Sequence, residues 1–198
     1  MKRSGLIILA ILAGLIIWGI SSQRGLVGVD ESVKKSWSDL QASYQKRLDQ
    51  VTQQVEVVKG AAKFEQETLT KVIEARSKAT SITMETKDAT PENVEKFKQM
   101  QNQVNTEMKG ALSRLLVTVE QYPTLKSNEN FQLLQKSIEG LENEVGKDRK
   151  GFNEEVRVYN TKVRSFPGSL MASILGFKVK EGFKDADKEA SKRPDIKL

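Results

Sequence analysis

Apolar and small side chains recur at steps of three and four residues from Val33 to Ala62, which is the spacing of one face of an α-helix. Charged and amide side chains fill most of the positions between them, so the other faces of this helix are solvated. Such a helix cannot bury its narrow stripe by itself and needs partner helices. The stripe consists of Val33, Trp37, Leu40, Tyr44, Leu48, Val51, Val55, Val58 and Ala62.

Three later segments repeat this spacing and supply the partners. They span residues 64–82, 94–122 and 131–166, and short polar stretches separate them. Their lengths and short connections predict an all-α protein whose body is an antiparallel, up-and-down four-helix bundle. Gly60 leaves one alternative open, because a bend instead of a break at this residue would give three long helices.

Several residues predict where these helices begin and end. Thr90 is a suitable N-cap, Pro91 suits the first helical position, and the carboxylate of Glu92 interacts favourably with the helix dipole. Pro123 ends the third body helix, because the residue before a proline disfavours the α region. The pair at 167–168, Pro-Gly, ends the fourth.

Four residues test the predicted core. Leu115 and Phe152 lie in unbroken apolar series, so we expect both to be buried. Gln101 and Asp148 occupy stripe positions although they are polar. They mark the bundle ends, set helix register through a buried polar contact, or line a ligand cleft.

An apolar run from Leu6 to Ile20 follows two basic residues and predicts a transmembrane helix once its flanking residues are included. A cleaved signal peptide is the alternative, although residues 19–21 make a poor cleavage site. We therefore expect a transmembrane anchor at 1–24 and a tether at 25–29. Asp30 is the expected N-cap of the first body helix.

The body is expected to cover residues 30–177. Its last segment, 170–177, is apolar but too short to span a bilayer, so the bundle end or the membrane surface must cover it. The near-neutral body favours the bundle end. Residues 178–198 are lysine-rich and predict a charged, disordered tail. Tyr159 and Asn160, near the end of the fourth helix, are interpreted as capping residues.

Composition excludes several kinds of chemistry. The chain has no cysteine and no histidine, which excludes thiol nucleophiles, disulfides and histidine-based metal sites or general bases. Of its net charge of +6, +3 lies in residues 1–24 and +2 in residues 178–198, so the body offers no basic stripe for a nucleic acid. The sequence predicts no catalytic, cofactor-binding or metal residues. The expected partners are the membrane and an unidentified protein, and homo-oligomerisation is left open.

Short sequence words occur in a fixed order from about residue 30 to residue 178: Trp37, Val58-Lys59-Gly60, Glu67-Thr68-Leu69, Glu74-Ala75-Arg76-Ser77-Lys78-Ala79, Tyr122-Pro123, Leu125-Lys126, Asn128-Glu129-Asn130-Phe131, Glu142-Asn143, Tyr159-Asn160, Phe166-Pro167-Gly168 and Gly176-Phe177. In this ordered set the chain resembles the LemA family of bacterial membrane-anchored proteins. Two positions depart from the family pattern. Residues 52–53 are Thr-Gln where the family often has Pro-Asn, and Glu144 stands where an arginine usually follows Glu-Asn.

The resemblance implies a four-helix bundle on an N-terminal membrane anchor and no established enzymatic activity. We therefore expect a non-enzymatic scaffold or protein-interaction module of the bacterial cell envelope. It would be a single-pass protein of the inner (cytoplasmic) membrane, with its body outside the cytoplasm because basic residues precede the apolar run. The alternative is a membrane-organising protein that contacts the bilayer through residues 170–177 and the basic tail.

Overall fold

The chain forms five helices and no strand within the residues that the structure, a computed structural model, describes: 3–61, 66–121 and 129–183. The predicted all-α class is therefore confirmed for these ranges. The helices are α1 (Arg3–Ala61), α2 (Gln66–Glu85), α3 (Pro91–Gln121), α5 (Glu129–Arg164) and α6 (Gly168–Leu175).

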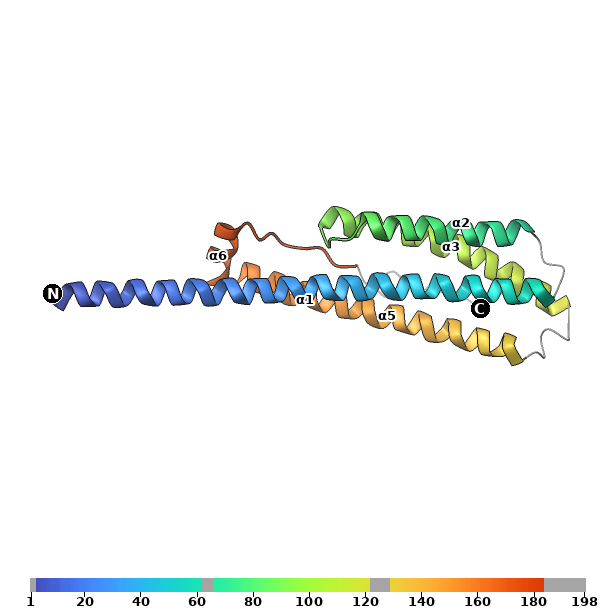
Figure 1. Cartoon of the computed structure of the whole chain (residues 1–198), viewed down its shortest axis with the longest axis horizontal. Helices are drawn as coiled ribbons and strands as arrows, with labels where there is room; N and C mark the ends of the chain where they lie inside the picture. Colours follow the sequence, from blue (N-terminus) through green and yellow to red (C-terminus); the bar gives the residue numbers. More distant parts are fainter. Residues whose placement is uncertain (1–2, 62–65, 122–128, 184–198) are drawn as a thin grey trace, which may run out of the picture.

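The long helix α1 is the axis of the arrangement. Helix α5 packs along α1 over the longest stretch, α2 and α3 pack against each other, and α2 also contacts α1. The N-terminal part of α1 projects well beyond the other helices (Figure 1). Helix α6 lies against α5 and α1 close to where this projecting part begins (Figure 1). The molecule is therefore a helical body with one helix extending from one end.

The continuity of α1 corrects the sequence prediction at the start of the body. The helix passes through residues 25–29 without a break, so this segment is not a separate tether and Asp30 is not an N-cap. Two glycines in a helix interior cost about 1 kcal/mol each relative to alanine. Burial of Leu26, which is fully buried in the same cluster as Val163 and Ala172, offsets this with roughly 1.5–3 kcal/mol.

The other helix boundaries agree with the sequence. Helix α1 runs through Gly60 to Ala61, and α2, which begins at Gln66, is a separate helix that packs against α1, so the alternative of three long helices is not observed. Helix α3 begins at Pro91, and the hydroxyl of Thr90 accepts a hydrogen bond from the backbone N–H of Asn93 at 3.2 Å. This confirms Thr90 as the cap of α3. The predicted stop at 123 lies outside the described residues.

The predicted apolar stripes form the core wherever their side chains are described, except for two exposed residues and for Ile138, which is half-buried against the second cluster. Phe152 is fully buried, as expected, whereas the side chain of Leu115 lies outside the described residues. Ile73 and Phe166 are exposed instead of buried. The buried stripe residues are Val33, Trp37, Leu40, Tyr44, Leu48, Val51, Val72, Ala75, Ala79, Ile82, Val94, Phe97, Val104, Met108, Leu141, Val145, Phe152, Val156, Tyr159 and Val163.

Trp37 stands at the centre of the larger of two buried clusters. Its ring centroid lies 5.0 Å from that of Phe97 on α3 and 5.1 Å from that of Phe152 on α5. The indole N–H donates to the backbone carbonyl of Thr86 at 2.9 Å, and the side-chain amide of Gln41 donates to the same oxygen at 3.0 Å. This one turn of α1 therefore holds α3, α5 and the α2–α3 connection together.

Polar side chains on the body helices differ in their burial and in their partners. Gln101 is buried, and its amide makes no hydrogen bond to the described part of the chain, whereas Asp148 is half-buried. Glu144, at the position that departs from the family pattern, pairs with Lys46 of α1 at 2.7 Å. This ion pair is half-exposed and joins α1 to α5, with an expected worth of about 1 kcal/mol or less.

Candidate functional site

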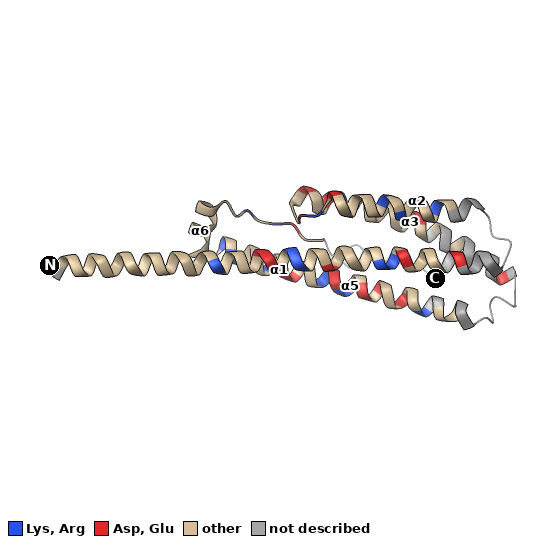
Figure 2. Cartoon of the chain, viewed as in Figure 1, with Lys and Arg blue, Asp and Glu red and all other residues tan. Residues whose placement is uncertain are grey.

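The projecting part of α1 has an uncovered apolar surface. Its leucine and isoleucine side chains from Leu6 to Ile20 are 47–69% exposed, and an 18-residue window has a mean hydropathy of 2.3 with none of it buried. By length and composition, this part of α1 can cross a membrane, a test that a signal sequence also passes. Figure 2 shows it as an uncharged stretch, in contrast to the mixed charges along the body helices. It is a candidate membrane anchor.

The short helix α6 is apolar on both its covered and its open faces. Ala172 is buried and Met171 packs against the core, so bundle capping holds for this face. Leu170, Ile174 and Leu175 are exposed, so capping is wrong for these residues. The backbone explains the division, because the chain leaves α6 in a left-handed turn after Leu175 and only one face of so short a helix reaches the bundle.

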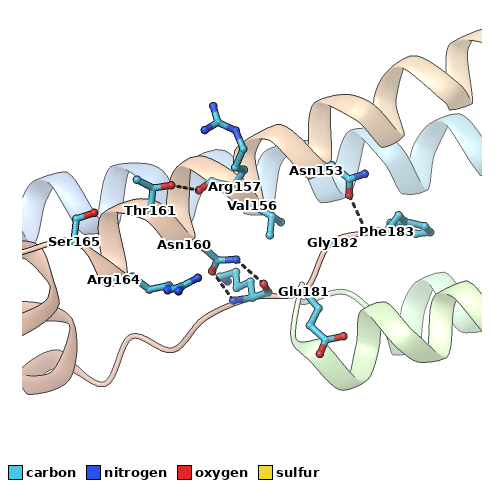
Figure 3. A pocket seen from close by; sticks show the side chains of 11 residues that line it. Asn153, Val156, Arg157, Asn160, Thr161, Arg164, Ser165, Glu181, Gly182 and Phe183 are labelled. Atoms are coloured by element: carbon cyan, nitrogen blue, oxygen red, sulfur yellow. Dashed lines mark hydrogen bonds between the residues drawn. The ribbon is translucent and has the colours of Figure 1, made fainter. Parts of the chain in front are cut away.

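Residues 177–183, which we call the strap, return from α6 along the surface of α5. Tyr159 donates its hydroxyl hydrogen to the carbonyl of Lys178 at 2.8 Å. The amide of Asn160 binds both backbone groups of Lys180, donating to its carbonyl and accepting from its N–H, each at 2.8 Å. Asn153 accepts from the N–H of Phe183 at 2.7 Å. Figure 3 shows the two asparagines reaching the strap from the same helix.

A charged contact fixes the middle of the strap to α1. The ammonium group of Lys180 lies 2.9 Å from the carboxylate of Asp30, and both side chains are only 16% exposed. Partial burial alone would raise the pKa of Asp30, but Lys180 and Lys34 outweigh it and hold this pKa below its ordinary value. Burial, and then the charge of Asp30, raises the pKa of the Tyr159 hydroxyl to about 12. The ion pair and the neutral phenol are therefore the favoured forms at neutral pH.

An aromatic side chain anchors the end of the strap. The ring centroid of Phe183 lies 6.0 Å from that of Phe152, 6.3 Å from that of Trp37 and 6.4 Å from that of Phe97. Gly182, just before it, passes close to α5, because a Cβ atom at this position would lie 2.7 Å from Oδ1 of Asn153. The strap therefore joins the central aromatic cluster through one ring, and glycine is favoured beside that ring because a Cβ atom would displace the amide oxygen of Asn153.

Beside the strap lies an open groove, seen in close-up in Figure 3. Its wall on α5 includes Asn153, Asn160, Thr161 and Arg164, and the strap itself forms the opposite side. No group of three His, Cys, Asp or Glu side chains in the described ranges is placed to hold a metal ion. The chemistry that this arrangement offers is the holding of an extended backbone by side-chain amides.

The sequence interpretation of this region needs two corrections. Tyr159 and Asn160 bind the strap and are not helix caps, and residues 178–183 are docked instead of disordered. The rest of the predicted tail lies outside the described residues. Asn153 and Phe183 were not singled out from the sequence. A signal existed for Asn153, because it precedes Asn160 by seven residues and each directly follows a core aromatic residue.

Comparison with known proteins agrees with the ordered sequence words. The profile of the LemA family matches residues 36–198. Magnetosome protein MamQ of Magnetospirillum gryphiswaldense is 36% identical to this chain over 73 residues, which is 37% of this chain and 27% of that protein. Magnetosome protein MamQ 2 of Paramagnetospirillum magneticum is 34% identical over 75 residues, or 38% and 28%. The matches therefore span less than a third of these curated relatives. The family profile covers most of the chain, and the protein belongs to the LemA family.

Proposed function

We propose that this protein is a non-enzymatic, membrane-anchored helical scaffold of the bacterial cell envelope that binds other proteins through its body. The observation that carries the proposal is the single helix α1, which presents an uncovered apolar surface at one end and the centre of the body core at the other. An apolar surface of this size is costly in water, and a bilayer is its natural cover. The continuity of α1 also favours a retained anchor, since signal cleavage near residue 21 would cut an unbroken helix.

The body of this scaffold is, in our proposal, an antiparallel four-helix bundle of α1, α2, α3 and α5. The sequence colours run in opposite directions along neighbouring long helices in Figure 1, which supports the up-and-down order. The side chains that meet around Trp37 come from α1, α3 and α5, and the second buried cluster joins α1, α2 and α3. Mixed charges cover the outer faces, which suits a surface that binds proteins instead of nucleic acid (Figure 2).

Anchoring and sidedness are testable in cells. We expect the chain to stay in the membrane fraction through an alkaline wash and to keep its N-terminal residues by intact mass. Because the chain has no cysteine, a Ser38→Cys variant carries one exposed label site on the body. A membrane-impermeant maleimide should label it in intact spheroplasts if the body lies outside the cytoplasm. Labelling only after lysis would place the body inside, and a washed-off, shortened chain would refute the anchor.

The scaffold role is tested by photo-crosslinking in native membranes. A crosslinking residue replaces Asp39 or Glu139, which are exposed on α1 and α5. We expect the same protein to be captured repeatedly from neighbouring positions on one face and to be lost from the opposite face. Capture no greater than that of an unrelated anchored helical protein would contradict the proposal.

A second candidate function is favoured by the open face of α6. Ile174 is 75% exposed, and Leu170 and Leu175 are exposed beside it, next to the base of the anchor. Such a face suits the headgroup boundary of a bilayer, where it would orient the body on the membrane. Replacing both Ile174 and Leu175 by Ser should leave the melting temperature unchanged and weaken the binding of the body to liposomes.

The matched control for this pair lies at exposed apolar positions elsewhere in the body. Ile73→Ser together with Val117→Ser changes two exposed apolar side chains on α2 and α3 and should leave liposome binding unchanged. Equal binding by the α6 variant and the native body would reject the bilayer contact. A lowered melting temperature with unchanged binding would instead show that α6 serves the bundle.

A further inference from the structure

The strap occupies a site that holds peptide backbone through side chains of the helical body. Four hydrogen bonds from Tyr159, Asn160 and Asn153 hold backbone groups at three strap positions. An asparagine amide offers a donor and an acceptor together, so Asn160 satisfies both backbone groups of one residue. These bonds do not depend on the side chains of the strap. The same groups would hold any extended segment that lay in the same register.

Three further contacts depend on the side chains of the strap, and they define which residues the site accepts. Asp30 faces a basic residue, at the position of Lys180. The closeness of Asn153 favours glycine two residues later, because a Cβ atom there would push away the amide oxygen that accepts from the N–H of Phe183. The cluster of Trp37, Phe97 and Phe152 accepts an aromatic ring at the next position. The ligand pattern is therefore a basic residue, any residue, glycine and an aromatic residue in extended conformation.

The strap is a surface ligand of the body, not part of its helical framework. Lys178, Val179 and Glu181 are exposed between its anchor points. Gly176, with φ of 77°, joins it to α6 at a left-handed turn, where the strap can pivot without changing a helix. The contacts of Trp37 with Phe97 and Phe152 do not involve the strap. Release of the strap therefore uncovers an apolar site lined by these three rings, which an aromatic side chain of a ligand can fill again.

The groove beside the strap favours a segment of another protein as the exchanging ligand. Thr161, Arg164 and Ser165 continue the α5 wall of the groove beyond the asparagine that holds Lys180 (Figure 3). A longer segment gains contacts there that the strap does not make. The strap of a second copy would gain only the contacts that the chain's own strap already provides. A foreign segment thus has a net advantage, which an exchanged strap lacks.

We propose that this groove binds an extended segment of a partner protein with the pattern basic–any–glycine–aromatic, and that the strap is its built-in competitor. The inference rests on the proposed scaffold function and names the chemistry of one partner. Because the strap is tethered to its site by a few residues, its effective concentration is on the order of millimolar. A partner segment must therefore outcompete it, which keeps the site closed to weak ligands.

A labelled peptide with the sequence of residues 178–183, Lys-Val-Lys-Glu-Gly-Phe, tests the site by fluorescence anisotropy on the full chain in detergent. We expect the Phe183→Ala variant, whose strap has lost its aromatic anchor, to bind the peptide at least about tenfold more tightly than the native chain. Lys180→Glu, which opposes Asp30 and leaves the aromatic cluster intact, is a second way to loosen the strap. Circular dichroism shows that each variant is folded.

Matched controls distinguish peptide binding at this site from non-specific binding. Peptides with alanine in place of the glycine or of the phenylalanine should bind at least tenfold more weakly. Adding Asn160→Ala to the Phe183→Ala chain should weaken binding to a similar degree, whereas adding Asn143→Ala, which changes an exposed asparagine on the same helix, should not. Absence of peptide binding by both folded, strap-loosened variants would overturn the inference.

Three further outcomes bear on the occupant and on the scaffold function. If the native chain is a dimer in sedimentation and Phe183→Ala makes it monomeric, the strap of a second copy is the occupant and a foreign partner is rejected. If peptide binding fails while photo-crosslinking in membranes still captures a partner, only this inference falls. If the peptide binds but membranes yield no partner, the site stands and the scaffold function falls.

Discussion

Replacing Trp37 by Phe and Gln41 by Met removes, one at a time, the two donors that share the buried carbonyl of Thr86. The donor–acceptor distances are 2.9 Å from the indole and 3.0 Å from the amide, and Thr86 is fully buried. Either single variant leaves the carbonyl with one donor. Each therefore loses only the net value of a hydrogen bond, about 0.5–1.5 kcal/mol, besides its own change in packing.

The double variant is expected to cost more than the sum of the two. With both donors gone, the carbonyl of Thr86 is buried and unsatisfied, which carries a desolvation penalty of about 1–3 kcal/mol. The smaller ring at position 37 leaves a cavity in the single and the double variant alike. The second hydrogen bond of Gln41, to the Thr86 hydroxyl at 3.1 Å, is likewise lost in both the Gln41→Met variant and the double variant. The cost of the cavity and the cost of this second bond both cancel in a double-mutant cycle, which compares the double variant with the two single variants. We therefore expect a coupling free energy of about 1 kcal/mol or more.

Urea unfolding of the full chain in detergent, followed by circular dichroism at 222 nm, measures the four free energies of unfolding. Gln45→Met is the control, because Gln45 lies one turn later on α1 and bonds to Asp49 at 3.1 Å instead of to Thr86. Combined with Trp37→Phe, it should be additive within about 0.3–0.5 kcal/mol. A coupling of this small size for the Gln41 pair would refute the shared carbonyl as the link between α1 and the α2–α3 connection.

Three other predictions follow from the same contacts. Phe152→Ala should lower the free energy of unfolding by about 3–5 kcal/mol, whereas Phe166→Ala, at a position 80% exposed, should change it by less than about 0.5 kcal/mol; urea melts decide both. Lys180 of the docked strap helps to lower the pKa of Asp30, so docking should be strongest well above the ordinary pKa of 3.8 and should weaken as the pH falls below it. Asp30→Asn should remove this dependence, which NMR shifts of strap amides report. Lys46→Met, opposite Glu144, should cost less than about 1 kcal/mol, and the cost should shrink in high salt.

The helical stripes were predictable because periodicity is a local property of the sequence. The spacing from Val33 onward identified the face of α1 that is buried, and Thr90 with Pro91 located the start of α3. The start of the body was not predictable in the same way. Glycines near residue 25 favour a break by propensity, but burial of Leu26 among side chains of α5 and α6 favours a continued helix. This burial depends on elements more than a hundred residues away.

The strap was missed because its binding uses backbone groups. The amides of Asn153 and Asn160 recognise N–H and C=O groups that every residue carries, and one lysine and one glycine, Lys180 and Gly182, are too common in a sequence to mark residues 178–182 as a ligand. Lysine-rich composition at this position indicates disorder. Only Phe183, an isolated aromatic residue in a polar segment, carried a signal, and its partners on three helices meet only in the folded chain.

If the candidate anchor crosses a membrane as proposed, the unbroken course of α1 makes the anchor and the body one rigid lever. From residue 25 to its end at Ala61, the helix extends roughly 55 Å at 1.5 Å per residue. A tilt of about 10° in the bilayer, well within the range of transmembrane helices, would swing the far end by about 10 Å. Rotation about the helix axis would likewise turn whichever face of the body carries a partner. Changes in membrane thickness would therefore change the tilt of the body relative to the membrane and its rotation about the axis of α1, because the described part of α1 has no hinge between anchor and body.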